Sequence, residues 1–286
     1  MDNYFDITNP DTAYEWLYSI LDIKQGNLIE DYILKCNNDI DKFFKAHIEE
    51  IERIDLNKLE LVAIHVTSND DNCRSLKKHG LRNLKLVLNG NTEMSRFLSA
   101  EQIRFDIERK QMFIQGKEYS IDYQKYLNMA HKSKEEDRLE RIAHKIYFDY
   151  QVNGFFFNSN IFSYGTSIEK HPEFLYTLSE FNKTTKGIDE KWDKFNQGYV
   201  IKYKSYVSDI EYYSFYESME EYLEDSYSNW IKLRYWLVSK AVSCCFSDLA
   251  SEVFAYMKAG IIIEPERILE CIPVEEWRKN DSKYFE

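Results

Sequence analysis

Three short segments, far apart in the chain, carry the residues whose types could do chemistry. They are AIHVTS at 63–68, with His65, Thr67 and Ser68; the aromatic run GFFFN at 154–158; and EVFAYM at 252–257, which opens with Glu252. An imidazole inside an apolar strand must find hydrogen-bond partners once water is excluded, and a hydroxyl, a backbone carbonyl or a bound ligand can each supply one. An aromatic run is the usual filling of a core, and an acid at the start of a strand is either a site residue or a charge that protects a sheet edge.

Motif searches exclude several common chemistries. The chain contains no GxGxxG, GxxxxGK[ST], HExxH or GxSxG sequence and no pair of CxxC motifs. Its six histidines lie far apart, so no local metal site is expected. The five cysteines are odd in number and scattered, which is typical of reduced thiols in a cytoplasmic protein.

The composition predicts a folded chain with a large aromatic core. Hydrophobic residues make up 44% of the 286 residues and aromatic residues 16%, whereas only 9 glycines and 4 prolines occur. A formal charge of −12 argues against a general polyanion binder, because phosphate binding needs clustered lysine and arginine. We find no signal peptide and no apolar stretch long enough to span a membrane, so we expect a cytoplasmic protein without a membrane partner.

The order of predicted elements indicates an α+β fold. Residues 1–58 show helical periodicity and form a predicted N-terminal helical segment, while residues 59–286 alternate short strands with helices. Helices are predicted at 71–79, ended by Gly80, and at 134–150, and a hairpin is predicted over 112–121 with its turn at Gln115-Gly116. Residues 214–247 form a predicted helical insertion.

In their order along the chain, the three segments AIHVTS, GFFFNSNIFSYGTS and SEVFAYMKAGIIIEPERI resemble the ADP-ribosyltransferase superfamily, in the His-Tyr-Glu branch that includes poly-ADP-ribose polymerases and bacterial toxins. His65 matches the histidine of the family's first strand, Gly154 to Phe157 match its middle strand, and Glu252 matches the glutamate that begins a late strand. The resemblance covers about residues 59–277. One departure is clear, since the family's middle-strand tyrosine aligns with Phe156.

The resemblance implies a split β-sheet core that binds NAD+ without a metal, and it implies a role for each matched residue. Glu252 would stabilise the positive charge that develops on the ribose as the bond to nicotinamide breaks, a problem similar to glycoside cleavage. The other matched residues would contact the rest of the dinucleotide. His65 would bind the adenosine ribose, with Thr67 and Ser68 around it, and the backbone of Val66 would bind the nicotinamide amide. Phe156 and Tyr164 would pack on the nicotinamide ring with Ser163 beside them, and Arg74 would bind the pyrophosphate. Glu264 is the alternative catalytic acid, but Pro265 follows it and ends the strand.

The function implied is that of an NAD+-dependent mono-ADP-ribosyltransferase, an intracellular toxin or anti-phage defence effector. Its acceptor would be a protein, RNA or DNA, and an antitoxin or other inhibitory partner would restrain it. Two alternatives stay open: an inactive interaction protein on the same fold, which Phe156 makes credible, and an NAD+ glycohydrolase that transfers the sugar to water.

Overall fold

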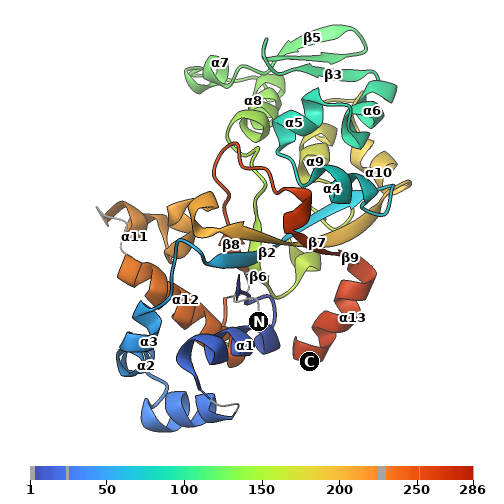
Figure 1. Ribbon diagram of the computed structural model, residues 1–286. Helices are drawn as coiled ribbons and strands as arrows, with labels where there is room; N and C mark the ends of the chain where they lie inside the picture. The colour runs from blue at the N-terminus through green and yellow to red at the C-terminus, as the bar shows by residue number, and fades with distance from the viewer. Residues whose placement is uncertain (1–3, 24–25, 225–229, 251, 286) are drawn as a thin grey trace.

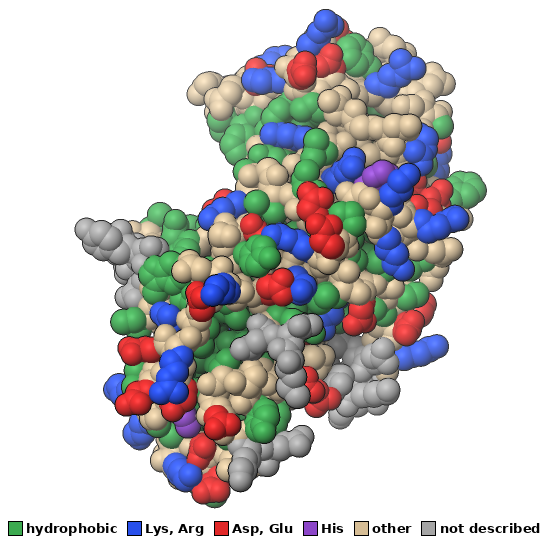
Figure 2. Space-filling model, in the orientation of Figure 1, with side chains coloured by type: hydrophobic (Ala, Val, Ile, Leu, Met, Phe, Trp, Pro, Cys, Tyr) green, Lys and Arg blue, Asp and Glu red, His purple; other side chains and the backbone are tan. Residues whose placement is uncertain are grey.

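The computed structural model describes residues 4–23, 26–224, 230–250 and 252–285 and has an α+β fold, which confirms the expected class. Figure 1 shows a central sheet with helices α1, α2, α3, α11 and α12 on its lower side and a second group of helices with a small sheet above it. Figure 2 shows the outline indented between these two parts, with acidic and basic side chains interspersed over the visible face.

The central sheet has six strands in the order β8-β6-β2-β7-β9, with β1 paired to β2. Its strands are β1 (Tyr4–Phe5), β2 (Glu60–Asn69), β6 (Gly154–Asn158), β7 (Gln197–Tyr206), β8 (Glu252–Ala255) and β9 (Ile268–Pro273). All these pairs are antiparallel except β1 with β2, which is parallel. The three segments singled out in the sequence therefore form three adjacent strands, β8, β6 and β2.

Strand β2 is the centre of this sheet. It pairs with β7 over ten residues, but its register with β6 consists of the single pair Ile64 and Phe155. Beyond that pair, residues 65–69 of β2 keep β7 on one side and leave the other side without a registered strand among the described residues. A sheet that opens in this way leaves room for a ligand at the end of β2.

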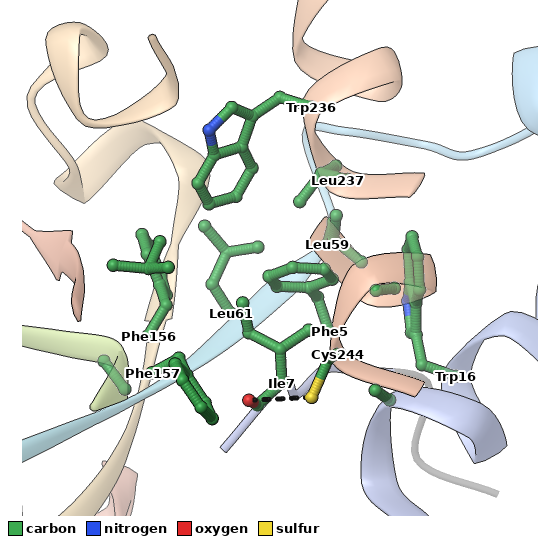
Figure 3. Packing of buried hydrophobic residues seen from close by; sticks show 14 of the residues in the cluster. Phe5, Ile7, Trp16, Leu59, Leu61, Phe156, Phe157, Trp236, Leu237 and Cys244 are labelled. Atoms are coloured by element: carbon green, nitrogen blue, oxygen red, sulfur yellow. Dashed lines mark hydrogen bonds between the residues drawn. The ribbon is translucent and has the colours of Figure 1, made fainter. Parts of the chain in front are cut away.

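The larger hydrophobic core lies below the sheet and includes the N-terminal helices. Helices α1 (Pro10–Leu21) and α12 (Trp230–Cys245) pack on each other and cover it, together with α2 (Ile40–Ala46), α3 (Ile48–Glu52) and a π-helix at Ile29–Lys35. Helix α11 (Met219–Glu224) precedes α12 in the chain, and its Met219 and Leu223 are exposed. Figure 3 shows Phe5 of β1 beside Trp16 and Trp236 in this core. The predicted helical segment 1–58 is thus joined to the sheet through β1, and residues 225–229 of the predicted insertion lie outside the described residues.

Residues 84–147 and 173–193, on either side of β6 in the sequence, form the upper part, which has a hydrophobic cluster of its own. Its elements are α5 (Leu84–Asn89), α6 (Glu93–Ala100), β3 (Ile103–Asp106), β4 (Gln111–Ile114), β5 (Lys117–Ser120), α7 (Tyr123–Leu127), α8 (Lys134–Tyr147), α9 (Glu173–Ser179) and α10 (Ile188–Asp193). The predicted hairpin is confirmed as β4 and β5, with Gln115 and Gly116 at φ 50° and 80°. No pattern in the sequence indicated this second cluster.

Local sequence explains several of these boundaries. Helix α8 begins at a capping box, in which the Ser133 hydroxyl accepts from the Glu136 N–H and the Glu136 carboxylate accepts from the Ser133 N–H. Helix α4 (Arg74–His79) is shorter than predicted and ends at Gly80, which has φ 74° and so favours glycine. Helix α13 (Val274–Phe285) follows β9 at the chain's end.

Candidate functional site

A cavity of about 820 Å³ opens where β2 and β6 diverge. Its walls are the second half of β2, helix α4 and the starts of α5 and α6 on one side, and the ends of α8 and β8 with the start of α9 on the other. The sheet supplies its floor, and the upper part of the molecule supplies most of its walls. This size is within the range of small-molecule sites.

His65 lies in this cavity with its protonation state fixed by the fold. Its Nδ1 donates to the backbone carbonyl of Asn153 at 2.7 Å, across the gap between β2 and β6. Because a carbonyl oxygen only accepts, the neutral ring carries its proton on Nδ1 and leaves Nε2 as an acceptor. Burial lowers the pKa of His65 and keeps the ring neutral, although the bond to Asn153 acts in the opposite direction.

The residues that follow His65 also line the cavity, but they differ in availability. Ser68 is buried, and its hydroxyl accepts from Trp192 Nε1 at 2.7 Å, so it holds α10 against β2. Val66 is paired with Val200 of β7 and is also buried. Thr67 is only half-buried, so it is more accessible from the cavity than Val66 or Ser68.

Four aromatic rings in mutual contact form one wall of the cavity. Phe155 contacts Tyr164 and Phe254 with ring centroids at 5.4 and 5.2 Å, and Phe254 stacks on Tyr256 at 5.4 Å. These rings come from three segments that meet only in the folded chain. A wall of this kind can take a planar ring by stacking.

Phe156 does not belong to this wall, which corrects the sequence-based assignment. It is fully buried on the other side of the sheet, where its ring contacts those of Trp236 and Phe215 (Figure 3). The physical reason is strand alternation: neighbouring residues of a strand point to opposite faces, so Phe156 enters the core when Phe155 faces the cavity. A bulge, at which Phe155 pairs with Phe254 and Phe157 pairs with Val253, then turns Phe157 to the core side as well. Phe155 takes the position in the cavity that was expected of Phe156.

Glu252 lies beside the aromatic wall but is not one of the lining residues. It is the first residue of β8, two residues before Phe254, pairs with Asn158 and is half-buried. Burial raises the pKa of Tyr164 and of Tyr256, and the negative charge of Glu252 adds to both shifts. Its carboxylate is therefore close enough to act on these two phenols.

Arg74 and Ser163 also lie outside the lining. Arg74 is exposed, and its Nε donates to the backbone carbonyl of Asp71 at 2.9 Å, which turns the guanidinium back onto its own loop. The Ser163 hydroxyl donates to the carbonyl of Asn160 within a short 3₁₀ turn. Of the predicted site residues, the cavity brings together His65, Val66, Thr67, Ser68 and Tyr164, while Arg74, Phe156, Ser163 and Glu252 do not line it.

The cavity also contains charged residues that the sequence analysis missed. Lys145 pairs with Asp149 and, at 2.8 Å, with Glu173, on the side of the aromatic wall. Arg82 and Arg96 are exposed at the opposite wall. Lys145 and Asp149 are four residues apart, a spacing at which side chains can meet, but no spacing in the sequence indicates that they share a cavity with Glu173, Arg82 and Arg96.

Glu93 is the acid that the cavity perturbs most among these. Burial, with a further contribution from the nearby charge of Asp70, raises its pKa to about 7, although the Asp70 N–H donates to the Glu93 carboxylate and acts against the shift. A carboxyl group that titrates near neutral pH in a cavity can exchange protons with a ligand. In the sequence it was visible only as an acid in the first turn of a helix.

The described residues contain no group of three or more His, Cys, Asp or Glu side chains placed to hold a metal ion. None of the helices in the described ranges has the length and apolar character of a membrane span. Comparisons of this chain with protein-family models, with curated proteins and with solved structures found no match.

Proposed function

We propose that this chain is an NAD+-dependent mono-ADP-ribosyltransferase that binds the dinucleotide in the cavity between β2 and β6. The observation that carries the proposal is the adjacency of β8, β6 and β2, the three strands that hold the segments resembling the family. The cavity of about 820 Å³ opens on these same strands and includes His65. A role as a toxin or defence effector, restrained by an inhibitory partner, belongs to the same proposal.

The charge distribution of the cavity fits the two unlike parts of NAD+. The nicotinamide ring is planar and positively charged, and it suits the wall of Phe155, Tyr164 and Tyr256, where Asp149 and Glu173 are near. The pyrophosphate is negative, and it suits the opposite wall, where Arg82 and Arg96 are exposed and a guanidinium can bind two phosphate oxygens.

His65 suits a ribose hydroxyl because its free nitrogen is an acceptor. The bond from Nδ1 to Asn153 orients the ring, and Nε2 can accept a hydrogen bond from a sugar hydroxyl without a change of protonation. Among the described residues, no hydrogen bond involving His65 Nε2 is found. A ligand hydroxyl would supply that partner.

In the proposed reaction the bond between nicotinamide and ribose breaks, nicotinamide leaves with the bonding electrons, and an acceptor nucleophile attacks the sugar carbon. The transition state is positively charged on the sugar, so a nearby carboxylate lowers its energy. We assign this role to Glu252, because its charge already acts on Tyr164 and Tyr256 at the aromatic wall. The acceptor is a macromolecule, either protein or nucleic acid.

The position of Glu252 outside the cavity lining favours a second candidate, a protein that binds NAD+ without turnover. In that case the cavity would act as a sensor, and ligand binding would regulate an interaction. The two candidates differ in one product, because only the enzyme releases nicotinamide.

The test is to incubate the full chain with NAD+ labelled in its adenylate phosphate, together with a cell lysate. We expect a labelled macromolecule and free nicotinamide, with labelling reduced about 100-fold or more in Glu252→Gln and in His65→Ala. Glu264→Gln is the matched control, since Glu264 is an exposed acid that does not line the cavity, and it should label normally.

Each other outcome identifies an alternative. Equal labelling by Glu252→Gln and the native chain would exclude Glu252 from the proposed role. NAD+ binding without nicotinamide release would support the second candidate, and free ADP-ribose without a labelled acceptor would indicate a glycohydrolase. A chain that neither binds NAD+ nor releases nicotinamide would refute both candidates.

A further inference from the structure

One stretch of this acidic chain carries charge of only the positive sign. Over the whole chain about one residue in six is acidic, yet residues 72–92 contain no Asp or Glu. The basic residues of this stretch are Arg74, Lys77, Lys78, Arg82 and Lys85, with His79 among them. The stretch forms α4, the loop after it and α5, and it supplies part of the cavity wall. Positive charge concentrated in this way, in a chain of net charge −12, is typical of a surface that binds a negatively charged partner.

Helix α4 presents this charge on a face of its own. Arg74 is three positions from Lys77 and four from Lys78, so the three side chains share one face of the helix. All three are exposed, and none of them lines the cavity. The residues of α4 that do line it are Ser75, Leu76 and His79. The helix therefore separates a basic outer face from the cavity.

These three residues and Arg82, which is exposed and lines the cavity just after α4, form a basic rim. Figure 2 shows blue side chains gathered beside a histidine in the region where Figure 1 places α4. Within the described ranges, no ion pair involves any of the four residues of the rim. Arg74 Nε donates to the Asp71 carbonyl at 2.9 Å and Arg82 Nε to the His79 carbonyl at 3.3 Å. Both bonds use Nε, so the terminal nitrogens of each guanidinium can still bind an anion.

Acidic residues border the basic rim away from the cavity. Asp70 and Asp71 precede α4, while Glu264 and Glu266 belong to the segment around the turn Pro265–Arg267, which packs against α4. Three of these four acids are exposed, and they would repel a negatively charged partner. The partner is therefore favoured to run from the rim toward the cavity.

The charge on the cavity side favours the same direction. Arg96 of α6 is exposed and lines the cavity together with Arg82. Glu93 lies in the same lining, and because burial raises its pKa to about 7, it carries only part of a negative charge at neutral pH. The rim and the cavity thus form one continuous path for phosphate groups.

An aromatic ring beside this path distinguishes a nucleic acid from an acidic protein. Tyr150 lines the cavity and is half-buried, and Lys85 Nζ lies 3.7 Å from the centroid of its ring. Cations interleaved with aromatic rings are the usual composition of sites that bind single-stranded nucleic acids, because phosphates pair with the cations and bases stack on the rings. A carboxylate-rich peptide has no need of the ring.

We propose that the basic rim binds the backbone of a single-stranded nucleic acid and presents one nucleotide to the cavity, so that the acceptor of the transferase is a polynucleotide. The identity of the acceptor rests on the proposed function, whereas the binding does not. A single strand is required because the bases of a duplex are stacked and cannot enter a cavity. In the transfer, an amino or hydroxyl group of the nucleotide forms a bond to the ribose carbon, the bond from that carbon to nicotinamide breaks, nicotinamide leaves with the bonding electrons, and the proton of the attacking group passes to water.

The first experiment measures binding by the full chain in the absence of NAD+. The probes are fluorescent mixed-sequence oligonucleotides of about 16 nucleotides, as single-stranded RNA, single-stranded DNA and a DNA duplex, each followed by anisotropy at several salt concentrations. We expect at least one single strand to bind more tightly than the duplex, and the stronger of the two identifies the sugar that is preferred.

Neutralising the outer face of α4 should weaken this binding without altering the cavity lining. The double variant Lys77→Gln/Lys78→Gln should bind the preferred strand about 10-fold more weakly, and the slope of log K against log salt should fall by about 1.4, or about 0.7 for each lost phosphate contact. The matched control is Lys42→Gln/Lys45→Gln, which removes the same charge from two exposed lysines of α2, below the sheet. The control should bind as the native chain does.

The second experiment treats the labelled product of the lysate reaction with nuclease or with protease. We expect nuclease to release the label, protease to leave it bound, and the Lys77→Gln/Lys78→Gln variant to label less while its affinity for NAD+ is unchanged. Absent oligonucleotide binding, equal binding by this variant and the native chain, or preference for the duplex would overturn the proposal. A product degraded by protease alone would overturn it and leave the proposed function in place. Oligonucleotide binding that depends on the rim, without nicotinamide release, would confirm the surface and refute the proposed function.

Discussion

At the scale of single residues, the alternation of side chains along β6 separates cavity lining from core packing. Phe155 lines the cavity, whereas the next residue, Phe156, is fully buried among Trp236, Phe215 and Phe5. A run of identical side chains thus serves two purposes, and only the fold distinguishes them.

Substituting these two neighbours separately should separate binding from stability. We expect Phe155→Leu to weaken NAD+ binding about 3- to 10-fold through loss of ring stacking, with a small loss of stability. Phe156→Leu should lower the free energy of unfolding by about 1–2 kcal/mol and leave NAD+ affinity unchanged. Calorimetric titration and thermal unfolding measure the two effects, and the reverse pattern would contradict the assignment of the two rings.

Glu93 should make stability depend on pH between about 4.5 and 7. Its pKa is raised in the folded chain, so in this range the folded chain keeps a proton that the unfolded chain has lost, and stability falls as pH rises. Glu93→Gln has no charge to bury. The variant should therefore gain about 1–2 kcal/mol over the native chain between pH 5 and pH 8.

Urea unfolding at several pH values measures this difference. The control is Glu108→Gln, since Glu108 is an exposed acid of the same upper part. A difference between native and Glu93→Gln chains that stays constant with pH would contradict the buried-acid explanation.

At the scale of elements, the cavity depends on how closely β6 approaches β2. A Cβ on Gly154 would lie 2.3 Å from the Ile64 carbonyl oxygen, so no larger residue fits where the two strands meet. We expect Gly154→Ala to lower the free energy of unfolding by about 2–4 kcal/mol, because either strand must shift. Gly165→Ala, with no atom within 4 Å of the added carbon, should change it by less than about 0.5 kcal/mol.

Local signals in the sequence predicted the elements well and the site only in part. The Gln115-Gly116 turn and the end of α4 at Gly80 depend on neighbouring residues, and both were readable. His65 was readable because a polar residue interrupts an apolar strand. The bulge at Phe156 and the approach of Glu93 to Asp70 depend on contacts between distant segments, which no local pattern encodes.

At the scale of the whole molecule, the upper part is attached to the sheet by a few specific contacts. The bond from Trp192 to Ser68 is one of them and joins the second cluster to β2 inside the cavity. We expect Trp192→Phe and Ser68→Ala each to destabilise the chain by about 1–2 kcal/mol. In the double variant the two losses should not add, and the coupling should be about 1 kcal/mol.

Chemical unfolding of the four chains gives that coupling energy. Additive losses would mean that the bond contributes nothing and that packing alone joins the two parts. NAD+ affinity measured on the same variants would show whether the attachment also shapes the cavity.

The central position of β2 has a consequence for the newly made chain as it leaves the ribosome. Its long partner β7 lies at 197–206, so β2 is paired on both sides only after those residues have been made. The cluster of residues 88–192 is complete by then and can fold first, since its contacts are closer in sequence. The cavity lies between β2 and this cluster and also takes Phe254 and Tyr256 into its wall, so it is complete only after β8 has been made.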